Sequence, residues 1–246
     1  MAFDFGRVVR RTFDPLKENP ATFFGIAFLL SALPGLAIVA MQSNLQQSAG
    51  IGASLGGNLL GGILGMILGA LTQGALIYAA VEHYRGRKAP IGASLRTAFA
   101  RLLPIVVVGF LYGLAVTVGL FLLVIPGLLI AVIWLVVIPA TVVEKKGIGE
   151  AFGRSRELTK GSFWPLFGLV VLYVILSAGI GFLAVSLTGM SPATGAITIT
   201  PAYVVLQLVS ATVTGAIAAA GVAAVYYELR QNKDGVGAED LADVFA

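Results

Sequence analysis

The sequence has no cysteine among its 246 residues and only one histidine, His83. A chain without cysteine forms no disulfide, has no thiol nucleophile and offers no thiolate to a metal ion. Charged residues are also scarce, since they make up 11% of the chain, whereas soluble domains contain about 25%. Hydrophobic residues make up 58% of the chain, and this composition indicates a polytopic membrane protein.

The residue types that catalysis or metal binding requires do not gather in the sequence. His83 has one adjacent carboxylate, that of Glu82, which gives too few ligands for zinc and no nucleophile for a catalytic triad. The glycine-rich stretch 52–62 lacks the lysine of a phosphate-binding loop. The net charge is +4, but the basic residues form neither a long arm nor a patch with interleaved aromatic residues. We therefore expect no enzymatic activity, no metal, no cofactor and no nucleic-acid partner.

Six apolar stretches each have close to the roughly 20 residues that a membrane-spanning helix needs. They are residues 21–41, 59–81, 104–124, 126–143, 163–187 and 201–227. The third and fourth stretches meet at Pro126 and Gly127 and should form a tight hairpin, while Pro34 and Pro139 predict kinks inside their stretches. We predict an all-α polytopic fold with one membrane domain over residues 1–230 and a short tail over residues 231–246.

The basic residues give the orientation of the predicted spans. All 16 lysines and arginines lie in the N-terminal segment, in residues 82–103, in residues 144–162 or after the sixth stretch, beyond residue 227. The opposite connections, at residues 42–58, around residue 125 and at residues 188–200, contain no charged residue. By the positive-inside rule, both termini are cytoplasmic. The spans themselves contain no charged residue, which argues against proton-coupled or ion-coupled transport.

An amphipathic segment precedes the first, third and fifth spans. These segments are residues 5–16, 91–102 and 148–158, and each is followed by the proline that begins a span, namely Pro20, Pro104 and Pro165. We predict three cytoplasmic amphipathic helices at the membrane surface. The pattern also favours three repeated units of one helix plus a two-span hairpin, at about 1–82, 83–144 and 145–230. The alternative is that any six-span protein with basic cytoplasmic loops resembles itself in this way by chance.

Glycines recur every four residues on one face of the second span and resemble a glycine zipper. The residues on this face are Gly57, Gly61, Gly65, Gly69 and Gln73. Small residues let helices approach closely, so the stripe predicts helix packing inside the bundle. The alternatives are homo-oligomerisation or a helix that slides.

Several basic residues at the cytoplasmic ends of the spans are candidates for contact with anionic lipid head groups. They are Arg10, Arg11, Arg85, Arg87, Lys88, Lys145 and Lys146. The expected partners are therefore membrane lipids, with a second copy of the chain or another membrane protein as further candidates.

The segment from Glu144 to Trp164 carries a pattern that resembles a known family. Its residues are Glu144, Gly147, Ala151, Arg154, Ser155, Leu158, Gly161 and Trp164. This pattern is similar to the signature of the bacterial glycerophosphodiester phosphodiesterase membrane-domain family and of related uncharacterised six-span inner-membrane proteins. The resemblance implies a bacterial inner membrane. It carries over no hydrolase activity, because in such proteins the hydrolase is a separate soluble domain and this chain has only a short tail.

Within this segment we expect structural roles. Glu144 should cap the preceding helix, and Arg154 and Ser155 should hold the amphipathic helix against the inner ends of neighbouring spans. The leading functional hypothesis is a non-enzymatic, lipid-interacting or scaffold protein in envelope and membrane homeostasis. The competing hypothesis is a conduit for a small neutral or amphiphilic molecule, with a path that reaches Gln73 or Gln207.

Overall fold

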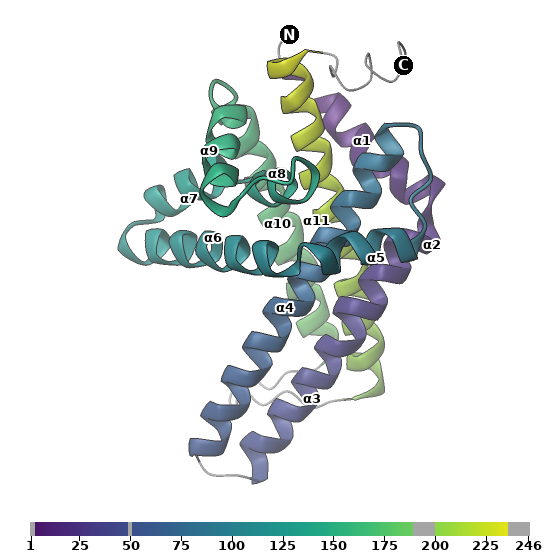
Figure 1. Ribbon diagram of the computed structural model, residues 1–246. Helices are drawn as coiled ribbons and strands as arrows, with labels where there is room; N and C mark the ends of the chain where they lie inside the picture. Colours follow the sequence, from purple (N-terminus) through teal and green to yellow (C-terminus); the bar gives the residue numbers. More distant parts are fainter. Residues whose placement is uncertain (1–2, 49–50, 189–199, 236–246) are drawn as a thin grey trace.

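The computed structural model describes residues 3–48, 51–188 and 200–235, and within these ranges the chain forms helices and no strand (Figure 1). Six helical stretches are long and apolar enough to cross a membrane. They are Pro20–Gln42, Leu55–Tyr84, Leu102–Leu122, Val124–Val143, Phe163–Leu183 and Pro201–Asp234. The predicted all-α polytopic fold is confirmed, and the chain is an integral membrane protein.

The first span is one continuous helical path with a local irregularity. It consists of α2 (Pro20–Ala27), a π-helical turn (Phe28–Ala32) and α3 (Leu33–Ser48). Pro34 lies just after the π-helical turn and has no backbone N–H, so it interrupts the regular hydrogen-bond ladder of the preceding turn. The predicted kink at Pro34 therefore takes the form of a π-helical turn. The second span belongs to α4 (Ile51–Tyr84).

The third and fourth spans form the tight hairpin that the sequence predicts. Helix α6 (Leu102–Leu122) is followed after one residue by α7 (Val124–Ile133) and then by α8 (Val137–Val143). A β carbon at Gly127 would lie 2.5 Å from the backbone nitrogen of Leu120, and one at Gly119 would lie 2.8 Å from Cα of Gly127. These glycines are required because the two backbones touch at the end of the hairpin.

The fifth span is the first part of α10 (Phe163–Thr188), and the sixth span has the same bounds as α11 (Pro201–Asp234). Helix α11 extends seven residues beyond the predicted end of the sixth span at residue 227, so the start of the predicted tail, from residue 231, is helical. Residues 236–246 of that tail lie outside the described residues.

All three predicted amphipathic segments are helices. They are α1 (Phe5–Glu18), α5 (Ile91–Ala100) and α9 (Ile148–Thr159). The side chain of Asp4 accepts a hydrogen bond from the backbone N–H of Arg7 and so caps the first turn of α1. This bond lowers the pKa of the exposed Asp4 carboxyl below its usual value.

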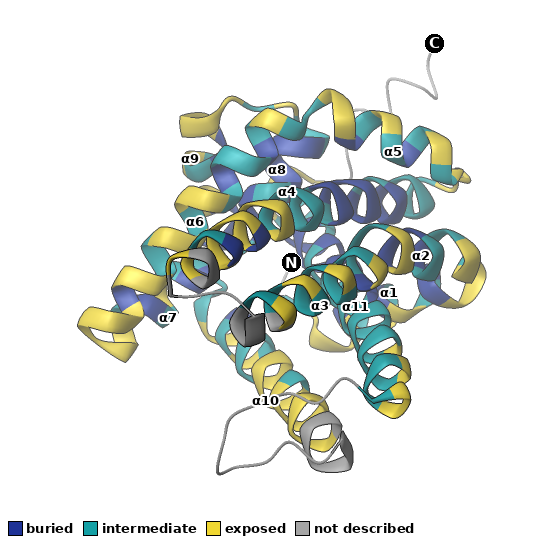
Figure 2. Cartoon of the chain, turned by 90° about the horizontal axis from the view of Figure 1, so that it is seen from below, coloured by how far each residue is buried: buried dark blue, intermediate teal, exposed yellow. Residues whose placement is uncertain are grey.

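The packed core lies where the charged residues are. Helices α4, α8 and α11 meet in the centre, and the three amphipathic helices cover them: α5 packs mainly on α4, α9 on α8 and α1 on α11. Away from this core the hairpins separate, so that α6–α7 leaves in a different direction from α3 and α4 (Figures 1 and 2). The share of residues that are buried in the apolar part of a span is 44% for Leu55–Tyr84 but only 6% for Phe163–Leu183. The assembly is thus held together mainly at its charged end.

Candidate functional site

The segment with the predicted motif is built by two turns of special backbone geometry. Helix α8 ends at Val143, and Glu144 occupies the C-cap position that the sequence predicts for it. Lys145 follows with a φ of 55°, which is unusual for a residue other than glycine. The backbone N–H of Gly147 donates to the Glu150 carboxylate at 3.2 Å and helps to start α9. At the other end Gly161 has a φ of 89°, a conformation that favours glycine and turns the chain into α10.

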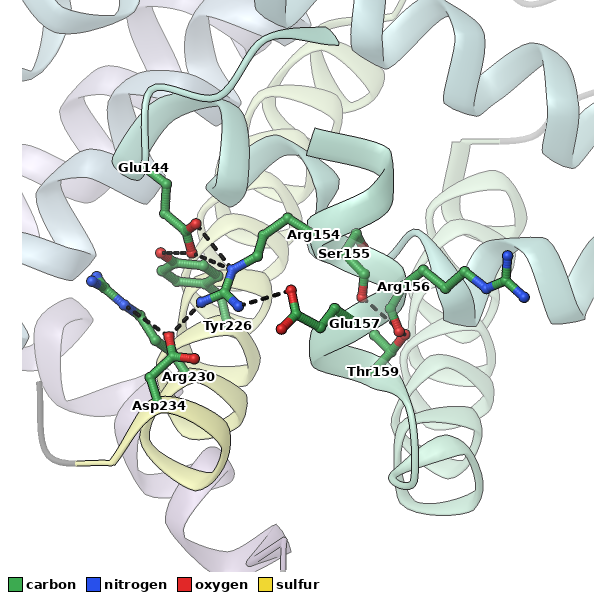
Figure 3. A network of polar contacts seen from close by, with 9 residues as sticks. All are labelled: Glu144, Arg154, Ser155, Arg156, Glu157, Thr159, Tyr226, Arg230 and Asp234. Atoms are coloured by element: carbon green, nitrogen blue, oxygen red, sulfur yellow. Dashed lines mark hydrogen bonds and ion pairs between the residues drawn. The ribbon is translucent and has the colours of Figure 1, made fainter. Parts of the chain in front are cut away.

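Arg154 is the centre of a polar network that joins three helices (Figure 3). Its Nε atom lies 3.1 and 3.0 Å from the two carboxylate oxygens of Glu144 at the end of α8. Its other nitrogens contact Glu157 of α9, at 3.1 Å, and Asp234 of α11. Only 14% of the Arg154 side chain and 11% of the Glu144 side chain are exposed. The guanidinium therefore connects α8, α9 and the C-terminal end of α11.

Two further residues of α11 complete this network. The Tyr226 hydroxyl donates to Oε1 of Glu144 at 3.0 Å, and Arg230 Nε lies 3.7 Å from Asp234. Burial disfavours the charged form of Arg154, but its hydrogen bonds to Asp234 and Glu144 outweigh this effect and raise the pKa of the guanidinium above its usual value. Arg154 stays charged, and the network acts as a structural connection between helices.

Ser155 and Thr159 contact the break between α7 and α8. There the backbone N–H of Val137 donates to the carbonyl of Trp134 at 3.1 Å, so the regular helical donor to the Ile133 carbonyl is lost. The Ser155 hydroxyl donates to this Ile133 carbonyl at 3.0 Å. The Thr159 hydroxyl, which has one proton, lies 3.1 Å from the same carbonyl and 3.0 Å from the carbonyl of Ser155. These contacts replace the missing backbone hydrogen bond and hold α9 against the break.

The remaining residues of the motif lie on both sides of α9. Ala151 and Leu158 are fully buried, whereas 76% of Trp164 is exposed at the start of α10. Part of the apolar face of α9 is therefore not available to a membrane surface, because Ala151 and Leu158 pack within the protein.

A second polar network, which the sequence analysis did not identify as a site, joins α1 to α11. Arg11 contacts Oε2 of Glu228 at 2.7 Å and donates to Oε1 of Gln231 at 2.8 Å. Its guanidinium carbon lies 4.8 Å from the centre of the Tyr227 ring, and the Tyr84 hydroxyl donates to its backbone carbonyl at 2.8 Å. Arg11 was a candidate for lipid contact on sequence grounds, yet its side chain is engaged within the protein.

The other candidate lipid contacts differ in their surroundings. Arg85 lies 3.0 Å and Arg87 lies 4.0 Å from the Glu82 carboxylate. Arg10, Lys88 and Lys145 are exposed, and Lys146 is half-buried.

The glycine stripe of α4 is in contact with a neighbouring helix over only part of its length. A β carbon at Gly57 would meet the side chain of Leu45, and one at Gly61 would lie 2.6 Å from the Gln42 side chain, so both glycines face α3. Equivalent β carbons at Gly65 and Gly69 would have no heavy atom of the described chain within 4 Å. Gln73 and Gln207, the polar residues of the conduit hypothesis, are both half-buried.

Comparison with protein-family models, with curated proteins and with solved structures finds no match to this chain. The family resemblance of the motif therefore stays a prediction. Among the described residues, no group of three or more His, Cys, Asp or Glu side chains is placed to hold a metal ion.

Proposed function

We propose that this integral membrane protein is a non-enzymatic, lipid-interacting scaffold of the bacterial inner membrane, with its packed charged end and both termini in the cytoplasm. In this role it supports membrane and envelope homeostasis by binding anionic lipid at the cytoplasmic surface. The observation that carries the proposal is that α1 has two apolar faces, of which the protein covers only one.

The first apolar face of α1 packs on α11 and its surroundings. Val8 is 2% exposed, Thr12 8% and Leu16 5%. The second face consists of Phe5, Val9 and Phe13, which are spaced by four residues and are 44%, 36% and 42% exposed. An exposed stripe of this kind on a helix directly before a spanning helix fits the apolar part of a membrane interface.

Exposed cations lie next to the second face. At 100° per residue, Arg10 and Lys17 follow Phe13 around the helix, and both are exposed. An apolar edge inserted among acyl chains would place these two cations at the level of the phosphates, where anionic lipids attract them. The chain's net charge of +4 acts in the same direction.

The depth of α1 in a bilayer tests this proposal directly. Because the chain has no cysteine, single-cysteine variants at Phe5, Val9, Phe13, Arg10 and Lys17 each carry one spin label. In bilayers that contain phosphatidylglycerol, we expect labels at the three apolar positions to be relaxed by oxygen. Labels at the two basic positions should be relaxed by an aqueous nickel chelate. Equal aqueous access at all five positions would contradict the proposal.

Lipid preference provides a second measurement. In native mass spectrometry of the full chain, we expect phosphatidylglycerol or cardiolipin to be retained in preference to phosphatidylethanolamine. The double variant Arg10→Gln, Lys17→Gln should lose much of this preference, whereas Arg96→Gln, at an exposed position of α5, is the control. Retention of no lipid class over another, together with recovery of no partner, would refute the proposed function.

A further inference from the structure

The three amphipathic helices have the same register. Each begins with a large apolar residue followed by glycine, namely Phe5–Gly6 in α1, Ile91–Gly92 in α5 and Ile148–Gly149 in α9. The fourth residues of the helices are buried in all three, and so are the eighth residues. They are Val8, Ser94 and Ala151 at the fourth position, and Thr12, Ala98 and Ser155 at the eighth. Equivalent positions therefore face the core in each helix.

The helices also occupy equivalent places. Helix α5 packs on α4, and α9 packs on α8, so each lies on the second helix of the hairpin that precedes it in the chain. No hairpin precedes α1 within the described residues, and α1 packs instead on α11, the second helix of the last hairpin. Helix α1 thus occupies on the last hairpin the place that α5 and α9 occupy on the first two, and it lies beside α11 (Figure 1).

A contact between arginine and glutamate recurs at two of the three joints. The seventh residue of α9 is Arg154, which binds Glu144 near the end of the fourth span, and the seventh residue of α1 is Arg11, which binds Glu228 near the end of the sixth. In α5 the seventh residue is Thr97. At that joint Glu82 pairs instead with Arg85 of the following turn, at 3.0 Å.

The two arginine–glutamate contacts are not equally complete. Both oxygens of Glu144 accept hydrogen bonds from Arg154, and Oε1 also accepts one from Tyr226. The side chain of Glu228 is 0% exposed, and its Oε2 lies 2.7 Å from Arg11 and 3.6 Å from Arg7. Its Oε1, however, has no hydrogen-bond partner among the described residues. One turn later on α11, both side-chain amide atoms of Asn232 are also buried without a partner in this part of the chain. Buried polar atoms left unpaired destabilise the packing around them.

We propose that the chain is a closed ring of three equivalent units, that α1 is the helix that closes the ring, and that the joint between α1 and α11 opens before the joint between α9 and α8. Opening of α1 brings water to Glu228 and Asn232 and uncovers the buried face of α11. This inference rests on the register and the joints and is independent of the proposed lipid-binding function.

Hydrogen exchange of the full chain in lipid nanodiscs tests the order of opening. We expect backbone amides of α1 to exchange about tenfold or more faster than those of α9. Because a terminal helix also frays, the decisive variants are Glu228→Gln and Glu144→Gln. Glu228→Gln should accelerate exchange in α1 and leave α9 unchanged, whereas Glu144→Gln should accelerate exchange in α9 and leave α1 unchanged. Equal protection of α1 and α9, or acceleration of both helices by either variant, would overturn the proposal.

The equivalence of the joints has a test that adds a contact rather than removing one. In Thr97→Arg the new side chain stands where α1 and α9 have their arginines, so we expect it to reach Glu82 and slow the exchange of α5 about threefold or more. Ala100→Arg, at an exposed position of the same helix, is the matched control. Slower exchange in Thr97→Arg that Glu82→Gln then abolishes supports the ring. Identical behaviour of Thr97→Arg and Ala100→Arg would refute it.

Discussion

Removal of the Arg154 side chain should destabilise the whole fold, because this guanidinium connects three helices. In Arg154→Met the apolar stem is kept and the charge is lost. The Glu144 carboxylate, 11% exposed, then retains only the hydrogen bond from Tyr226. A carboxylate buried to this extent without a cation is costly, and α9 also loses its ion pair with Asp234 of α11.

The expected size follows from the exposure of the three partners. Removing one partner of a fully buried ion pair costs about 3–5 kcal/mol, whereas an exposed pair contributes about 0–1 kcal/mol. Glu144 is near the first case, Glu157 is 65% exposed and Asp234 is 34% exposed. We therefore expect a loss of about 2–4 kcal/mol in the free energy of unfolding for Arg154→Met. For a chain of this length, such a loss lowers Tm by about 5–15 °C.

Thermal unfolding of the purified protein in one fixed detergent measures this loss. Arg156→Met is the matched control, because Arg156 is exposed and points away from the network (Figure 3), and its Tm should change by less than about 2 °C. A double-mutant cycle of Arg154→Met with Glu144→Gln isolates the pair, and we expect a coupling of about 1–3 kcal/mol. The charge reversal Arg154→Glu should impair folding or insertion further. A Tm for Arg154→Met equal to that of Arg156→Met, with no coupling to Glu144, would refute the reasoning.

Three further substitutions test other parts of the fold in the same assay. The hydroxyls of Ser155 and Thr159 both contact one backbone carbonyl in the break between α7 and α8, so Ser155→Ala with Thr159→Val should destabilise by about 1–3 kcal/mol. Gly127→Ala places a β carbon 2.5 Å from the backbone nitrogen of Leu120, and separating the α6–α7 hairpin should cost about 1–3 kcal/mol. Gly161→Ala should cost about 1–2 kcal/mol, because residue 161 has a φ of 89°.

Matched controls exist for each of these changes. Thr159→Ser keeps the hydroxyl and should preserve most of the stability. Gly113→Ala lies in α6, where a β carbon would have no heavy atom of the described chain within 4 Å, and should be tolerated. Gly153→Ala lies in the interior of α9 with equally open surroundings and should stabilise by about 0.5–1 kcal/mol. If Gly127→Ala and Gly161→Ala are as stable as these controls, then neither the close approach at residue 127 nor the positive φ at residue 161 requires glycine.

Local features of the fold follow from the sequence because they depend on neighbouring residues. Length and hydropathy decide which stretches can cross a membrane, so six spans were predictable. Periodicity decides which residues share a helix face, and it located α1, α5 and α9. The tight hairpin was predictable because the third and fourth apolar stretches meet directly at Pro126 and Gly127. The position of Arg154 on the charged side of α9 was also predictable, ten residues from Glu144.

Periodicity does not reveal which partner a helix face meets. In the sequence, Val8 and Val9 belong to one apolar stripe of α1, but only Val8 is buried on the protein, since a broad stripe fits both a helix and a lipid surface. The contact of the Ser155 and Thr159 hydroxyls with the Ile133 carbonyl depends on packing in the same way.

The sequence by itself determined that this is a six-span membrane protein with amphipathic helices before alternate spans and its basic residues on one side. Only the tertiary structure decided how the hairpins join at their charged ends. Arg11 meets Glu228 across 217 positions, and Arg154 meets Asp234 across 80. Such pairs form because α4, α8 and α11 pack in the centre and bring the ends of distant helices together. Charge alone does not decide which of several carboxylates each arginine at this end of the bundle pairs with.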